Sequence, residues 1–205
     1  MKKTRFIIIS LFVFITVRCK QSPDTLYSKN SGDLETYFLS EKVLALIKDE
    51  TARTKFKDGC ILSSEKKHQK AKDLFLKANA IEPNNVLILN AIGIELSILK
   101  QLDMSSSYFE NSLKVDSSVS ETYLNYGVLL VKKKEYLNAI EIYKKGLEFE
   151  NVKSQKGYFH YNIANAYYRM NNHTEAMKYL NLASKLVTEP RAMQDIEELR
   201  LVLKN

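Results

Sequence analysis

The chain has 205 residues, 45% of them hydrophobic, with 3 prolines and 6 glycines. This composition excludes a largely disordered protein and favours a helix-rich fold with one core or a short repeat array. The formal charge of +7 includes Lys2, Lys3, Arg5 and Arg18, which leaves +3 for the rest of the chain. Lysines and glutamates alternate there, which indicates a solvated helical surface and does not favour nucleic-acid binding.

Residues 1–18 have the pattern of an export signal. Three basic residues precede an apolar run at 6–17, which is short for a membrane-spanning helix. Cys19 follows, and its position resembles the acylated cysteine of a bacterial lipoprotein, although Arg18 stands where that family has a small residue. The resemblance implies an exported lipoprotein anchored in a bacterial membrane, facing the periplasm or the surface. An uncleaved N-terminal anchor and simple secretion remain the alternatives.

The segment after Cys19 is expected to connect this anchor to the folded part. Residues 19–32 are polar and predict a tether, and residues 33–51 predict a first helix. Cys60 is the other cysteine, so no intramolecular disulfide can form if Cys19 is acylated. We expect Cys60 to be a small packing residue.

A constant interval between glycines organises most of the chain. Gly59, Gly93 and Gly127 are evenly spaced, and each is followed at a second fixed interval by an aromatic residue: Phe75, Phe109 and Tyr143. Small residues lie between and after them, and a fourth copy follows a short insertion, with small or apolar residues in the corresponding slots at Ala164, Ala176, Leu180 and Ala183. The pattern predicts four units followed by a closing helix at 191–205. The predicted units are 52–85, 86–119, 120–153 and 157–190.

These slots resemble those of the tetratricopeptide repeat, most closely in the stretches 71–85 and 162–183. The resemblance implies an all-α fold, a right-handed superhelical stack of antiparallel helix pairs. A glycine within a helix costs about 1 kcal/mol relative to alanine, so we expect the recurrent glycines to permit a close helix crossing. Ser105 and Ser112 depart from the alanines usual in the family. Asn172 and Glu175 have the spacing of a helix capping box.

The family resemblance also implies a concave binding face formed by the first helix of each unit. The basic and amide side chains by which some family members hold a terminal carboxylate are incomplete here, which disfavours recognition of a free C-terminus. Alternatively, the residues of the first predicted helix, 33–48, cover this face. The predicted partner-binding residues are Leu87, Asn90, Ile94, Leu124, Asn125, Val128, Val131, Tyr161, Asn162, Asn165, Tyr168 and Arg169.

The sequence offers little for catalysis. His68 and His173 occupy a slot that holds Leu102 and Tyr136 in other units, which suggests packing, and His160 has no metal-ligand spacing. We expect no enzyme activity, cofactor, metal, nucleic acid or small-molecule substrate. The sequence predicts a membrane-tethered scaffold or adaptor that binds another cell-envelope protein. The alternative is a structural assembly protein that self-associates through the repeat stack or the N-terminal helix.

Overall fold

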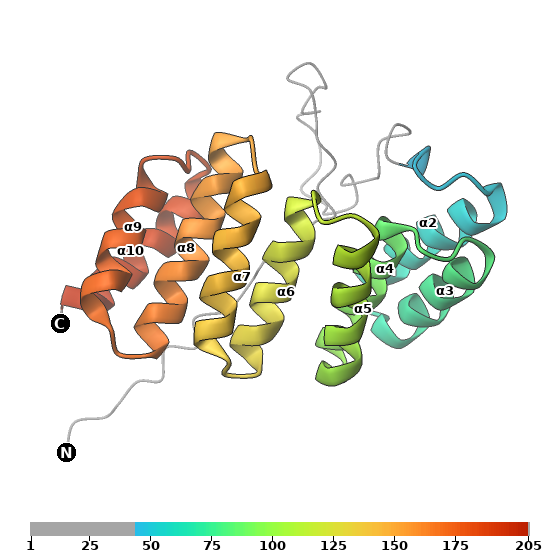
Figure 1. The fold of residues 1–205 in the computed structure, drawn as a ribbon, viewed down its shortest axis with the longest axis horizontal. Coiled ribbons are helices and arrows are strands. Elements are labelled where there is room, and N and C mark those ends of the chain that lie inside the picture. Colours follow the sequence, from blue (N-terminus) through green and yellow to red (C-terminus); the bar gives the residue numbers. More distant parts are fainter. Residues whose placement is uncertain (1–43, 205) are drawn as a thin grey trace.

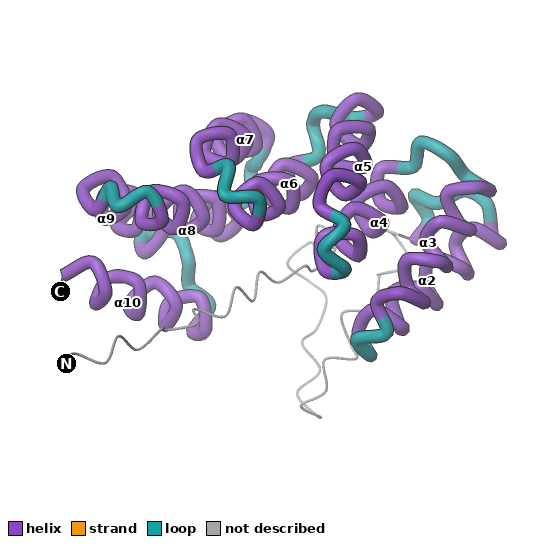
Figure 2. Tube along the Cα trace, turned by 90° about the horizontal axis from the view of Figure 1, so that it is seen from below, coloured by secondary structure: helices purple, strands orange, loops and turns teal. Residues whose placement is uncertain are grey.

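The computed structural model describes residues 44–204, and this part of the chain is built from α-helices without strands. Successive helices run antiparallel and stand side by side in a row from α2 to α10 (Figure 1). The row bends into an arc (Figure 2). Helix α10 lies on the inner side of this arc, next to α8 and α9 (Figure 2). The fold is therefore an all-α solenoid. Its helices are α2 (Glu50–Ser64), α3 (His68–Ile81), α4 (Val86–Ile98), α5 (Leu102–Val115), α6 (Ser120–Lys132), α7 (Tyr136–Phe149), α8 (Lys153–Arg169), α9 (His173–Ser184) and α10 (Pro190–Lys204).

The recurrent glycines lie where the two helices of a pair cross. A Cβ atom on Gly59 would lie 2.6 Å from the ring of Phe75, and one on Gly93 would lie 2.8 Å from Phe109. Atoms of real side chains do not approach so closely, so only glycine fits these positions without a shift of the ring. The expected close crossing is confirmed, and the partner of each glycine is the aromatic ring that follows it at the fixed interval in the sequence.

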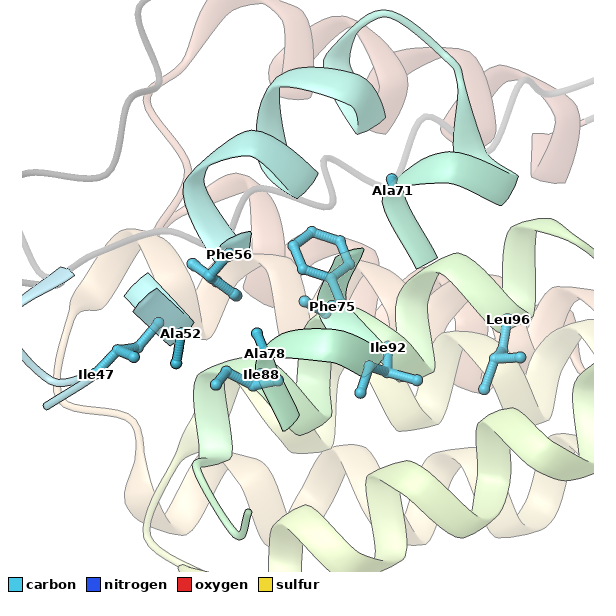
Figure 3. Close-up of a cluster of buried hydrophobic side chains, with 10 residues drawn as sticks. Ile47, Ala52, Phe56, Ala71, Phe75, Ala78, Ile88, Ile92 and Leu96 are labelled. Carbon is cyan, nitrogen blue, oxygen red and sulfur yellow. The ribbon is translucent and has the colours of Figure 1, made fainter. Parts of the chain in front are cut away.

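Buried apolar side chains gather in clusters along the arc. The first joins α2, α3 and α4, where Phe56 and Phe75 have ring centroids 5.3 Å apart and Ile88 and Ile92 approach from α4 (Figure 3). The second joins α6, α7 and α8, and the third joins α8 and α9 to Ile196 and Leu199 of α10. Each cluster includes residues of neighbouring pairs, so the pairs stabilise one another.

The junction between the second and third pairs has a smaller apolar core. Its buried members are Ile94, Phe109 and Leu129. Serine replaces alanine nearby: Ser105 Oγ donates to the carbonyl of Gly93 at 2.6 Å, which satisfies the buried hydroxyl. The serines that depart from the family pattern are thus accommodated by hydrogen bonds.

Polar side chains begin several helices. Asp49 accepts from the backbone N–H of Ala52 at 2.8 Å, and Asn85 accepts from Leu87 at 3.1 Å. Asn172 accepts from the N–H of Glu175 at 3.2 Å, which confirms one bond of the predicted capping box. The N–H of Asn172 donates to the carbonyl of Tyr167 at 3.0 Å, so the reciprocal bond of the box is not formed.

The predicted signal, the tether and most of the predicted helix at 33–51 lie outside the described residues. Where the structure describes that helix, the prediction is wrong: the chain turns at residues 45–47, and Asp49 caps the new helix α2. The guanidinium of Arg53 donates to the carbonyls of Leu44 and Ile47, which fixes the turn. Ile47 is fully buried in the first apolar cluster.

Candidate protein-binding face

The predicted binding residues lie on α4, α6 and α8, the first helices of the second, third and fourth pairs. Figure 2 shows α6 on the inner side of the arc relative to α7. The structure separates the predicted residues into three groups by exposure. Asn90, Ile94, Val128, Val131, Asn162 and Asn165 are buried; Leu87, Leu124, Asn125, Tyr161 and Tyr168 are half-buried; and Arg169 is exposed.

Asn90 belongs to a buried polar network. Its Nδ2 donates to Thr122 Oγ1 at 2.6 Å, to Ser112 Oγ at 3.1 Å and to the carbonyl of Val86 at 3.2 Å. Because a carbonyl can only accept, the bond to Val86 identifies which end of the amide is the nitrogen. The network connects α4 to α5 and α6. Asn90 therefore holds the second and third pairs together, a role that spacing alone did not reveal.

Two other predicted asparagines are also buried, on α8. Asn162 donates to the carbonyl of Tyr158 at 2.9 Å, one turn earlier in the same helix. Asn165 is 3% exposed, and its buried Oδ1 has no hydrogen-bond donor. Asn165 therefore faces the interior of the stack, and its Oδ1 is not accessible to a partner.

The aromatic residues of α8 are partly covered by α10. Tyr161 and Tyr168 pack with Ala192, Met193 and Leu203 against the third apolar cluster. Burial raises the pKa of Tyr161 to about 12, and the carboxylates of Asp195 and Glu198 contribute. Helix α10 therefore covers part of the face that the sequence predicted to bind a partner.

The accessible remainder is small and mixed in character. Leu124 and Asn125 lie on α6, Tyr161 and Tyr168 on α8, and Arg169 at the end of α8. Together they offer apolar surface, an amide and one cation, which suits a peptide with both apolar and hydrogen-bonding groups.

The structure also contains a polar cluster that the sequence analysis missed. Glu95 of α4 is 1% exposed, and its carboxylate accepts from Ser63 Oγ at 2.5 Å and contacts His68 Nδ1 at 2.9 Å. His68 is therefore a hydrogen-bonding residue, and its interpretation as a packing residue is wrong. The equivalent His173 is exposed, with its ring 6.2 Å from Tyr168. Glu95 follows a run of apolar residues in α4, so nothing in the local pattern marks it as a partner of the preceding pair.

Ser63 and His68 both bind the carboxylate of Glu95 and do not bond to each other, so this cluster lacks the hydroxyl-to-imidazole contact of a nucleophile and its base. Burial and the charge of Lys156 lower the pKa of His160, whose Nδ1 has no hydrogen-bond partner. Within residues 44–204, no group of three or more histidine, cysteine, aspartate or glutamate side chains could hold a metal ion. The helices in this range include none with the length and apolar character to cross a membrane.

The helix pairs define an all-α solenoid, and comparison with known families shows which type of repeat they resemble. Residues 52–85, 120–152 and 158–186 match the family model of the tetratricopeptide repeat. These stretches are therefore similar to the tetratricopeptide repeat, and they lie in three of the four helix pairs. The second pair, α4 and α5, has the same structure but no such match.

Solved structures with the same fold are distant in sequence. YrrB, described as a tetratricopeptide repeat protein with an unusual peptide-binding site, is 18% identical with a TM-score of 0.60, covering 77% of this chain and 83% of its own. MamA is 20% identical with a TM-score of 0.60, covering 76% and 83%. The Sgt2 repeat domain from Aspergillus fumigatus is 20% identical with a TM-score of 0.56, covering 63% and 85%. No curated protein matches the sequence.

Proposed function

We propose that this protein is a scaffold that captures a peptide segment of another cell-envelope protein on the inner face of its repeat stack. Cys19, as an acylated residue, tethers the scaffold to a bacterial membrane after export, with residues 19–32 as the connection. The function requires no cofactor, and the partner is a protein and not a small molecule.

The observation that carries this proposal is the set of accessible side chains on the inner helices: Leu124 and Asn125 on α6, and Tyr161, Tyr168 and Arg169 on α8. The half-buried side-chain amide of Asn125 would exchange hydrogen bonds with the backbone of an extended peptide. The neighbouring aromatic and cationic groups would contact the side chains of that peptide. The peptide-binding site attributed to YrrB supports the proposal as an analogy between proteins of the same fold.

The apolar part of the proposed face lies on α6. Leu124 and Asn125 are half-buried, so each has surface to contribute to a partner without leaving the core. Arg169, at the exposed end of α8, would favour an acidic or hydrogen-bond-accepting group in the partner. A partner segment with an apolar residue, a free backbone N–H and an acceptor therefore fits best.

Site-specific photocrosslinking in the native cells tests the proposal. A photoreactive amino acid replaces Asn125 in one full-length variant and Arg169 in another. The matched control places it at Lys144, an exposed residue of α7. We expect the same discrete adduct from both inner-face positions and none from Lys144.

The mass of the adduct separates the alternatives. An adduct with a different protein supports the scaffold, whereas an adduct between two copies of this chain supports the assembly alternative. Absence of adducts at both inner-face positions, or an equal yield at Lys144, contradicts binding at this face. Mass measurement of the mature N-terminus tests acylation of Cys19 separately.

A further inference from the structure

The turns that join the two helices of each pair contain lysines in a conformation that side chains disfavour. Lys66, Lys100 and Lys134 have φ values of 61°, 63° and 65°, and Asn171 has the corresponding value of 57° in the fourth pair. This left-handed region favours glycine and tolerates asparagine. The three lysines are spaced at the same interval as the glycines of the helix crossings. Three turns thus retain lysine where stability alone would favour glycine.

These three lysines are also exposed, and within residues 44–204 their ammonium groups are unpaired. No ion pair or side-chain hydrogen bond of Lys66, Lys100 or Lys134 occurs within the described part of the chain. By contrast, Lys67 pairs with Glu65 at 2.6 Å and Lys133 pairs with Asp103 at 3.1 Å. The ammonium groups at the tips of three successive turns are therefore available to an external anion.

The two edges of the solenoid carry opposite charge. Because the helices run antiparallel, the turns within pairs lie on one edge and the turns between pairs on the other, as the α6–α7 and α7–α8 turns show in Figure 1. The within-pair turns, with the last helical residue before each, contain Lys66, Lys67, Lys100, Lys132, Lys133, Lys134 and Arg169 against Glu65 and Glu135. The between-pair turns, counted in the same way, contain Lys185 against Glu82, Asp116, Glu150 and Glu189.

Exposed apolar side chains lie along the positively charged edge, here called the basic edge. Met104 is 56% exposed near the start of α5, and Leu137 is 64% exposed near the start of α7. A shallow hollow of about 330 Å³ adjoins Leu137, lined by Lys134, Glu135, Tyr136, Leu137, Asn138 and Met170. Cations and apolar tips therefore occur together on this edge.

We propose that the basic edge docks on the surface of an anionic phospholipid bilayer. Lysine ammonium groups at turn tips would contact lipid phosphates, and Met104 and Leu137 would enter the headgroup region. Lysine suits such a surface because its charge sits on a flexible stem and needs no fixed geometry from its partner. Nucleic acid fits less well, since the edge presents no row of exposed aromatic rings for base stacking within the described residues.

The tether length is compatible with this orientation. About 25 residues separate Cys19 from Leu44, and even with the helix predicted from residue 33 onward this length can span about 60 Å. The 15-residue helix α2 is about 22 Å long. A chain anchored at Cys19 can therefore present either edge to the membrane, and the charge of the edges decides between them.

Vesicle co-sedimentation of the full-length chain tests this inference. Binding is compared between vesicles with about 30% phosphatidylglycerol in phosphatidylcholine and vesicles of phosphatidylcholine alone, because the N-terminal apolar run can enter both. The test variant carries Lys66→Gly, Lys100→Gly and Lys134→Gly. These substitutions remove three positive charges and also relieve the backbone strain in the three turns. The control carries Lys77→Gln, Lys114→Gln and Lys145→Gln, which remove the same charge from exposed positions on α3, α5 and α7.

We expect the preference of the wild-type chain for anionic vesicles to fall roughly fivefold for each lysine, so about a hundredfold in the glycine variant. The control variant should lose much less of the preference for anionic vesicles. An unchanged preference in the glycine variant, or an equal loss in the control, overturns the proposal. Tighter binding of the wild-type chain to a single-stranded oligonucleotide than to anionic vesicles at equal salt also overturns it. The proposal is also overturned if the glycine variant still binds anionic vesicles as the wild-type chain does and loses self-association instead.

Discussion

The ring of Tyr143 lies directly against the backbone of Gly127, and the same relationship joins Gly93 to Phe109 and Gly59 to Phe75. The fourth pair achieves the close helix crossing with different residues. Ala164 occupies the glycine slot and Leu180 the aromatic slot, and both are fully buried in one cluster. A larger residue on one helix is thus matched by a smaller residue on the other, as close packing requires.

Gly127→Ala should lower the free energy of unfolding. Alanine favours the helix by about 1 kcal/mol, but overpacking against the Tyr143 ring costs about 1–3 kcal/mol or more, so we expect a net loss of about 1–2 kcal/mol. The double variant Gly127→Ala with Tyr143→Leu reproduces the Ala164 and Leu180 combination and should recover part of that loss. Urea denaturation of the four proteins in this cycle measures the coupling. Stability of Gly127→Ala equal to or above wild type would show that the crossing has room for a methyl group.

Tyr143→Phe should stabilise the protein. The hydroxyl of Tyr143 is buried without a hydrogen-bond partner, and burial raises its pKa well above the usual value. Phe75 and Phe109 fill the same slot in the first two pairs. Removing an unsatisfied hydroxyl should raise the free energy of unfolding by about 1 kcal/mol, measured by thermal or urea denaturation. A loss of stability would indicate that the hydroxyl has a partner, such as a bound water.

The sequence predicted the solenoid because its packing slots recur at a constant interval, and each slot fixes a small or large residue at a helix contact. The exposure of the polar slots was less predictable. Asn90 and Asn165 lie on the expected helices, but the position of the neighbouring helices decides whether an amide faces a partner or the interior. The basic edge was missed for a related reason. Lys66, Lys100 and Lys134 are distant in sequence, and their acidic neighbours in the chain lie on other faces or form pairs of their own.

Asn90→Ala distinguishes an internal residue from a binding residue. Its loss removes bonds to Thr122 and Ser112 in a buried site, so we expect the free energy of unfolding to fall by about 2–3 kcal/mol. Asn125→Ala is the matched control, because Asn125 is half-buried on α6 and should change stability by about 0.5 kcal/mol or less. Chemical denaturation of both variants provides the comparison. Equal effects would mean that the Asn90 network contributes no stability.

Lys100→Gly should stabilise the turn between α4 and α5. The left-handed backbone at φ 63° costs lysine about 1–2 kcal/mol, whereas glycine loses about 0.5–1 kcal/mol more backbone entropy on folding. The expected net gain is about 0.5–1 kcal/mol, which thermal denaturation can detect. Asn171→Gly is the control, with a smaller gain because asparagine tolerates this conformation. If Lys100→Gly is destabilising, the lysine side chain makes a favourable contact that outweighs its backbone strain.

Alkaline pH should loosen the packing of α10 on α8 through Tyr161. The folded protein raises the pKa of Tyr161 to about 12, from about 10 in the unfolded chain, because the phenol is buried and faces Asp195 and Glu198. Below pH 10 the phenol is neutral in both states, so stability does not depend on its ionisation. Between pH 10 and about 12 the unfolded chain releases its proton first, and stability falls as pH rises. Tyr161→Phe removes this contribution, so the free energy of unfolding of the variant should fall less steeply with pH across the same range. Tyr123, Tyr126 and Tyr143 still contribute to the slope in both proteins. Urea denaturation at pH 8, 10 and 11 measures the two slopes, and identical slopes would show that Tyr161 ionises equally easily in both states.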